Sequence, residues 1–140
     1  MLFQKNMAFK RALQMMVLYY LLSVGFNVIS LLRESFGNTP LIEGKPVASI
    51  IMLTLFLVLA YSGYKHWRWP FLGVGLFGLI ALPLRGIIPH IGALLDPAKQ
   101  AVYSSEIVVW IALAINLFGL SVLVLGFYYA PFLKKVQETL

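Results

Sequence analysis

Four residues of this 140-residue chain have side chains that could together bind an ion or a polar headgroup. They are Glu34, Arg85, His90 and Glu106. Two carboxylates, a guanidinium and an imidazole can hold an anion, a lipid headgroup or a proton where they meet in a membrane protein. One hypothesis is that Arg85 meets both glutamates in a pocket that opens outward, with His90 at its rim. The interpretation that we favour is that Arg85 reaches water or pairs with one carboxylate, and that both glutamates are ordinary helix-end charges.

Polar residues within the apolar segments could extend this pocket toward the middle of the membrane. Ser23, Asn27 and Ser30 fall on one face of a helix at 100° per residue, and Asn116 lies within a later apolar run. Hydroxyl and amide side chains find hydrogen-bond partners across helices but not in lipid. We therefore expect this polar face to look into the protein.

Metal and cofactor sites are not expected. The chain has no cysteine, which excludes thiolate metal sites and iron–sulfur clusters. Its two histidines, His66 and His90, are separated by a whole predicted span, so they should emerge on opposite faces of the membrane and cannot ligate one haem iron. No HxxxH, HExxH or ExxH spacing occurs either. We predict neither a metal nor a cofactor.

The elements that must position these residues are membrane helices. Apolar residues make up 61% of the chain and charged residues 11%, and the mean hydropathy is +0.88, which excludes a water-soluble fold. One span needs roughly 20 residues, so the chain has room for four crossings and short loops. The net charge of +6 comes from basic residues spread over every loop, so we expect no nucleic-acid partner. We predict a single all-α domain, an integral membrane four-helix bundle.

Charges, prolines and turn residues set the limits of the predicted spans. With the third span ending near Ile88, Arg85 would lie about 4.5 Å from the end of its helix, close enough for its side chain to reach water. The prolines, glycines and polar residues after that point favour an interfacial or re-entrant segment. The predicted spans cover about residues 12–32, 47–64, 71–88 and 107–130, and the interfacial or re-entrant segment covers about residues 90–105.

Small residues indicate where the helices pack closely. Gly75, Gly78 and Gly86 share one face of the third span, and Ala112 and Gly119 share one face of the fourth. Small side chains allow neighbouring helix backbones to approach each other in a membrane. The tyrosine pairs 19–20 and 128–129 are interpreted as part of an aromatic belt at the membrane interface.

The basic residues predict the orientation of the bundle. Seven flank one side and four flank the other, so the positive-inside rule places both termini in the cytoplasm, in what we expect to be a bacterial inner membrane. The first set is Lys5, Lys10, Arg11, Lys65, Arg68, Lys134 and Lys135, and the second is Arg33, Lys45, Arg85 and Lys99.

Three classes of function are compatible with this sequence. We favour an accessory or structural subunit of a larger membrane assembly, because no charge is expected deep in the membrane and no catalytic motif is present. The expected partners are then membrane lipids and either another membrane protein or further copies of the chain. The first alternative is an oligomeric transporter or channel for a small solute or ion. The second alternative is a protein that binds or modifies lipid headgroups in the outward pocket.

Overall fold

The protein is an all-α membrane bundle, as the sequence predicts. The computed structural model describes residues 2–136, and four of the helices in this range are long and apolar enough to cross a membrane. The third of these crossings consists of three consecutive helical elements, which we call together the third helix, residues 68–95. The elements are α1 (Leu2–Ser35), α2 (Pro46–Tyr64), α3 (Arg68–Ala81), the π-helix η1 (Leu82–Ile87), α4 (Ile88–Leu95), α5 (Pro97–Gln100), α6 (Glu106–Tyr129) and the 3-10 helix η2 (Pro131–Val136).

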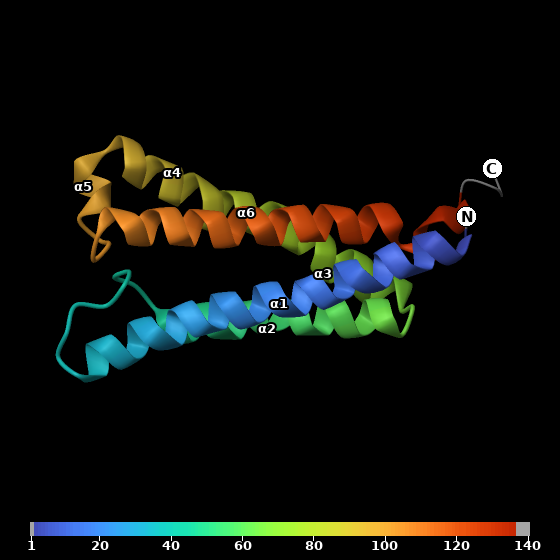
Figure 1. The fold of residues 1–140 in the computed structure, drawn as a ribbon, viewed down its shortest axis with the longest axis horizontal. Helices are drawn as coiled ribbons and strands as arrows, with labels where there is room; N and C mark the ends of the chain where they lie inside the picture. The colour runs from blue at the N-terminus through green and yellow to red at the C-terminus, as the bar shows by residue number, and fades with distance from the viewer. Residues whose placement is uncertain (1, 137–140) are drawn as a thin grey trace.

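The four crossings are antiparallel and give the bundle two distinct ends (Figure 1). The first described turn of α1, the turn between α2 and α3, and η2 lie at one end, which we call the terminal end. The loop 36–45 and the segment 96–105, which includes α5, lie at the other end, which we call the loop end. Lipid offers no hydrogen bonds to the backbone, so long apolar runs satisfy their amides and carbonyls internally as helices.

The two segments at the loop end are joined to each other through their backbones. The Glu43 amide donates to the Val102 carbonyl at 2.8 Å, and the Ser104 amide donates to the Leu41 carbonyl at 2.9 Å. Asp96 caps α5 by accepting from the Ala98 amide at 3.0 Å. The two backbone bonds between the segments connect the helix pair α1–α2 to the helix pair formed by the third helix and α6.

The third helix differs from the sequence-based expectation. Its helical backbone continues through Pro83 and Pro89 to Leu95, instead of ending near residue 88. Proline lacks an amide proton, and the wider turn of η1 accommodates the interruption in hydrogen bonding at Pro83. Arg85 consequently lies ten residues before the helix end, about 15 Å along the axis rather than about 4.5 Å.

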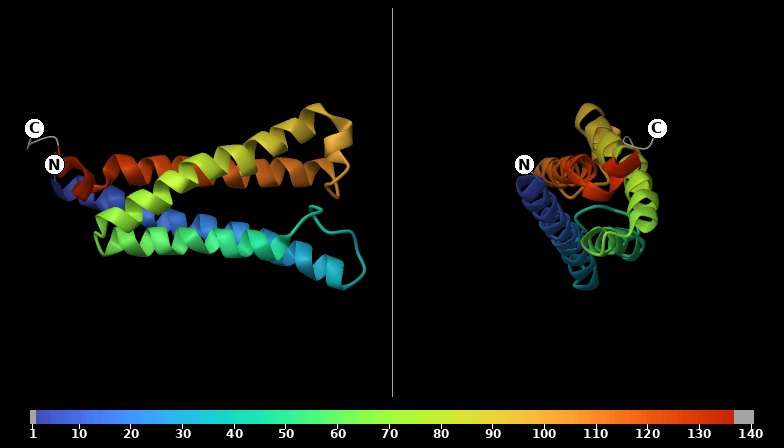
Figure 2. Two further views of the ribbon diagram at one scale, coloured as in Figure 1. Left: turned by 180° about the vertical axis from the view of Figure 1, so that it is seen from behind. Right: turned by 90° about the vertical axis from the view of Figure 1, so that its right-hand side faces the viewer.

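The two helix pairs are packed together at the terminal end and diverge toward the loop end. There the interior is filled by buried apolar side chains such as Met16, Leu59, Phe71 and Leu123, each at most 1% exposed. α2 packs against α3, whereas η1 and α4 pack mainly against α6. Figure 2 shows the third helix crossing from α2 toward α6 as it approaches the loop end. This divergence leaves space between the helix pairs.

Candidate functional site

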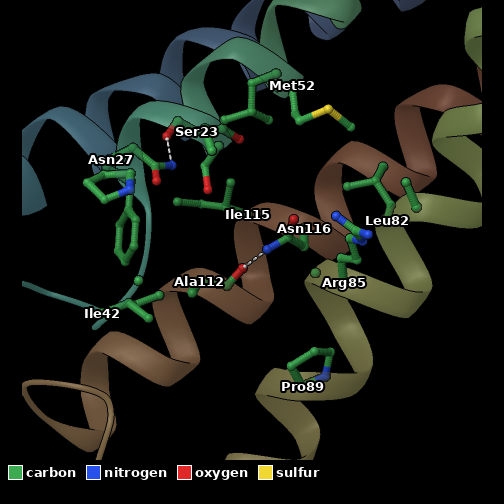
Figure 3. Close-up of a pocket in the computed structure, with 18 of the residues that line it drawn as sticks. Ser23, Asn27, Ile42, Met52, Leu82, Arg85, Pro89, Ala112, Ile115 and Asn116 are labelled. Atoms are coloured by element: carbon green, nitrogen blue, oxygen red, sulfur yellow. Dashed lines mark hydrogen bonds between the residues drawn. The ribbon is translucent and has the colours of Figure 1, made fainter.

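The space between the diverging helices is a cavity of about 640 Å³ (Figure 3). All four crossings and both segments of the loop end contribute to its lining. Cavities that bind small molecules in proteins typically measure roughly 300–1,000 Å³, so this volume is large enough for a small organic ligand.

The cavity opens sideways, between α2 and the third helix. The lining residues on α1 and α6 are all buried or half-buried, whereas the exposed ones lie on the two helices that flank the opening and on the loop end. Buried examples are Tyr19, Ser23, Ser30 and Ala112. Exposed examples are Ser49, Met52, Phe77, Arg85 and Pro89. Both α2 and the third helix are long and apolar enough to cross a membrane, so the opening lies on the side of the bundle rather than at its end.

The polarity of the lining changes along the bundle axis. Toward the loop end the cavity is bordered by charged and polar groups, namely Glu43, Lys45, His90, Tyr103 and Ser30. Toward the centre of the bundle its lining is mostly apolar, with the Tyr19 hydroxyl as the polar exception. The apolar residues at this deep end are Leu55, Phe56, Val74, Phe77, Gly78 and Ala81.

Arg85 projects from η1 at the boundary between these two parts of the cavity. Among the described side chains it makes neither an ion pair nor a hydrogen bond; the ion pair found there joins Lys99 and Asp96 at 3.8 Å. Figure 3 shows its side chain leaving the third helix on the side that faces Asn116. A cation within the hydrocarbon region of a membrane is costly unless water or an anion accompanies it.

Asn116 is the centre of a chain of hydrogen bonds that forms one wall of the cavity. Its Nδ2 donates to the Ala112 carbonyl at 2.8 Å and lies 3.2 Å from His90 Nε2. The hydroxyl of Tyr19 donates to Asn116 Oδ1 at 3.4 Å. On the other side of the imidazole, His90 Nδ1 lies 2.6 Å from the hydroxyl of Tyr103. The chain thus connects α1, α6, α4 and the segment 96–105.

The polar face of α1 forms the opposite wall. Asn27 Nδ2 donates to the Ser23 carbonyl at 2.8 Å, and Ser30 Oγ accepts from the amide of Leu41 at 3.0 Å. Ser30 therefore anchors the loop 36–45 to α1. Ser23 is 6% exposed, and its Oγ makes no hydrogen bond of good geometry, although Tyr19 lies beside it one turn earlier.

The structure brings together only part of the predicted acidic and basic cluster. Arg85 and His90 both line the cavity, but Glu34 and Glu106 do not. Glu34 is exposed in the last turn of α1, and Glu106 Oε1 accepts from Trp110 Nε1 at 3.3 Å on its own helix. The separation follows from the length of the third helix, because Arg85 lies about 15 Å below the end where both glutamates are found.

The small residues occupy close contacts between helices, and three of the five border the cavity. Gly78, Gly86 and Ala112 are lining residues. A Cβ atom on Gly86 would lie 2.5 Å from Asn116 Oδ1, so the amide rests directly on the glycine backbone. The other two predicted packing residues, Gly75 and Gly119, contact the rings of Phe127 and Tyr19 respectively.

Two tyrosines of the site were not expected from the sequence. Tyr19, interpreted as a belt residue, is 1% exposed and forms the floor of the cavity. Its position one helical turn before Ser23, on the same face, was a usable signal. Tyr103 had no comparable signal, because its contact with His90 depends on how the segment 96–105 folds back.

Neither a metal site nor similarity to known proteins indicates a function. Among the described residues, no three His, Asp or Glu side chains lie close enough to hold a metal ion. The chain matches no protein-family model, and comparisons with curated proteins and with solved structures found no significant match.

Proposed function

We propose that this protein binds an acidic amphiphile, that is, a molecule with an anionic headgroup and an apolar chain. The headgroup pairs with Arg85, and the chain lies in the deep part of the cavity or leaves it between α2 and the third helix. Arg85 carries this proposal, because it is a guanidinium without an ion pair among the described side chains, located in a laterally open cavity about 15 Å from the end of its helix.

An anion suits Arg85 better than a neutral ligand does. An intramembrane charge is commonly paired or directed at a substrate path, and no described carboxylate lies within ion-pair distance of this guanidinium. Guanidinium presents a planar fork of donors that matches the oxygens of a carboxylate or phosphate. The bound anion would therefore supply the missing partner charge.

The gradient of polarity favours an amphiphile over a small free anion. Charged and polar groups border the cavity toward the loop end, and Phe56, Val74 and Phe77 line it toward the bundle centre. A lipid-like molecule in the same leaflet has this arrangement, with its headgroup at the surface and its chain directed inward. The lateral opening lets such a molecule enter without leaving the membrane.

The predicted orientation determines which leaflet of the membrane supplies the ligand. If both termini are cytoplasmic, as the distribution of basic residues predicts, the loop end faces outward and the cavity takes its ligand from the outer leaflet of the bacterial inner membrane. The site then serves to hold, present or sense an acidic lipid there.

The other predicted functions have less support from this geometry. A transport path would have to pass Tyr19, below which the interior is filled by residues such as Met16 and Leu123. An accessory role was favoured because no deep charge was expected and no catalytic motif is present, and the position of Arg85 within the third helix weakens the first of these reasons. It stays a prediction with no structural observation of its own.

Binding of palmitate to the purified protein in detergent micelles tests the proposal. We expect saturable binding at one site, and a loss of affinity of about tenfold or more in Arg85→Leu, since a hydrogen bond to a charged group contributes roughly 1.5–3 kcal/mol. Arg85→Lys should retain part of the affinity. Lys10→Leu is the control, because Lys10 is exposed near the terminal end and does not line the cavity.

Two results would contradict the proposal. One is wild-type protein that does not bind palmitate or an acidic lysolipid above the level seen in empty micelles. The other is an equal loss of affinity in Arg85→Leu and Lys10→Leu, which would indicate general attraction to positive charge. Far-ultraviolet circular dichroism of each variant confirms that helix content is unchanged.

A further inference from the structure

Asn116, His90 and Tyr103 form one wall of the cavity and are joined to one another by hydrogen bonds. Its hydrogen bonds determine where the protons lie, because each bond restricts the next. This inference rests on the proposed function and adds to it the second group that holds the headgroup.

The carbonyl of Ala112 sets the orientation of the Asn116 amide. A backbone carbonyl can only accept, so the atom 2.8 Å from it must be the amide nitrogen, as placed. That nitrogen then directs its second proton toward His90 Nε2, 3.2 Å away. His90 Nε2 must therefore be an unprotonated acceptor, and in neutral imidazole the proton is on Nδ1.

The proton on Nδ1 in turn determines the role of Tyr103. The Nδ1–H group donates to the Tyr103 oxygen, 2.6 Å away, so the hydroxyl acts there as an acceptor. Its own proton must point elsewhere, and no described group accepts it. Burial raises the pKa of the Tyr103 phenol, which keeps that proton in place at neutral pH. Accepting a hydrogen bond also polarises the O–H group and strengthens it as a donor.

We propose that Tyr103 is the second headgroup donor of the cavity and that His90 is the positioning residue that directs its proton to the ligand. The headgroup oxyanion lies between Arg85 and Tyr103. Arg85 and Tyr103 both line the cavity, and His90, which contacts Tyr103, is five residues beyond Arg85, about 7.5 Å along the helix axis. The recognised chemistry is an oxyanion with at least two acceptor oxygens, either a carboxylate or a phosphate ester.

Binding measurements with three single-chain probes test the role of Tyr103. The probes are palmitate, 1-palmitoyl lysophosphatidate and methyl palmitate, an uncharged control with the same chain. We expect Tyr103→Phe to lower the affinity for one or both acids about tenfold and to change the affinity for the ester less than twofold, since only the acids accept a charged hydrogen bond. The acid that loses more affinity identifies the headgroup class.

The positioning role of His90 is tested by which of its ring nitrogens carries the proton, because a structural contact alone would not require the proton to be on Nδ1. In ¹⁵N-histidine-labelled protein, long-range ¹H–¹⁵N spectra should show His90 protonated at Nδ1 and unprotonated at Nε2, with His66 as the internal comparison. His90→Phe should also lose affinity for the acids, and combining it with Tyr103→Phe should add little, because the two residues act as one unit.

The outcomes separate this proposal from the proposed function. If Arg85→Leu loses palmitate and Tyr103→Phe does not, the amphiphile site stands and the role of Tyr103 is refuted. Equal losses for acid and ester would assign Tyr103 a structural role only and refute it as well. A proton on His90 Nε2 would refute the positioning role. Wild-type protein that binds neither acid would refute both proposals.

Discussion

The contact between Gly86 and Asn116 gives a prediction about stability that the structure makes quantitative. A Cβ atom at position 86 would lie 2.5 Å from Asn116 Oδ1 and 2.8 Å from its Cγ, whereas ordinary van der Waals contact begins near 3.4 Å. The alanine variant must therefore displace the Asn116 amide, which is held on its other sides by the Ala112 carbonyl and His90. Gly86→Ala should break the hydrogen bonds of this wall.

The expected cost combines three contributions. The amide loses its hydrogen bonds to Tyr19 and His90, about 1 kcal/mol each. Overpacking of the helix contact adds about 1–3 kcal/mol. The higher helix propensity of alanine returns about 1 kcal/mol. The free energy of unfolding should fall by about 2–4 kcal/mol in total.

Unfolding by sodium dodecyl sulfate, followed by circular dichroism, measures this change. Gly73→Ala is the matched control on the same helix, because nothing lies within 4 Å of a Cβ atom there, and it should be neutral or slightly stabilising. Combining Gly86→Ala with Asn116→Ala should remove the collision and recover part of the loss. A Gly86→Ala variant as stable as Gly73→Ala would show that the amide does not rest on Gly86 and would refute the reasoning.

Three further predictions follow from other contacts. Ser30→Ala should speed hydrogen exchange at the loop amides that Ser30 binds, measured by mass spectrometry, whereas Ser35→Ala, whose hydroxyl bonds within its own helix, should not. Because burial raises the pKa of Tyr103, the unfolded chain loses that proton first as pH rises above 10.0, so wild-type stability should decline more steeply than that of Tyr103→Phe; equal slopes would contradict this. The chain has no cysteine, so Asn38→Cys in intact cells should react with a membrane-impermeant maleimide and Trp67→Cys should not, and the reverse pattern would overturn the predicted orientation.

The four-helix architecture could be predicted because apolar runs long enough to cross a membrane have few alternative structures. The polar face of α1 could be recognised for a similar reason, since the helical period alone places Ser23, Asn27 and Ser30 on one side. In the structure these residues line the cavity. Both results depend on local sequence and helix geometry only.

The depth of Arg85 could not be predicted in the same way. Pro83, Gly86 and Pro89 normally indicate the end of a helix, and the sequence does not reveal that the helix continues past them through a π-helical turn at Leu82–Ile87. The role of Tyr103 depends on long-range backbone pairing between two loops, which has no periodic signal. The residues that complete the cavity are therefore those placed by tertiary contacts.

The π-helical turn acts as a register shift within one continuous helix. A π turn contains about one residue more than an α turn, so it changes the direction in which every later side chain points. If residues 82–87 wound as a regular α-helix instead, each later side chain would be rotated by about 100°, and His90 would turn away from Asn116. Deleting one residue between 82 and 87 would remove the wide turn and restore the present direction, because that turn absorbs the extra residue. The location of the polar rim is thus encoded in a residue count, and a related chain with a regular α-helix here should carry one residue fewer in this segment.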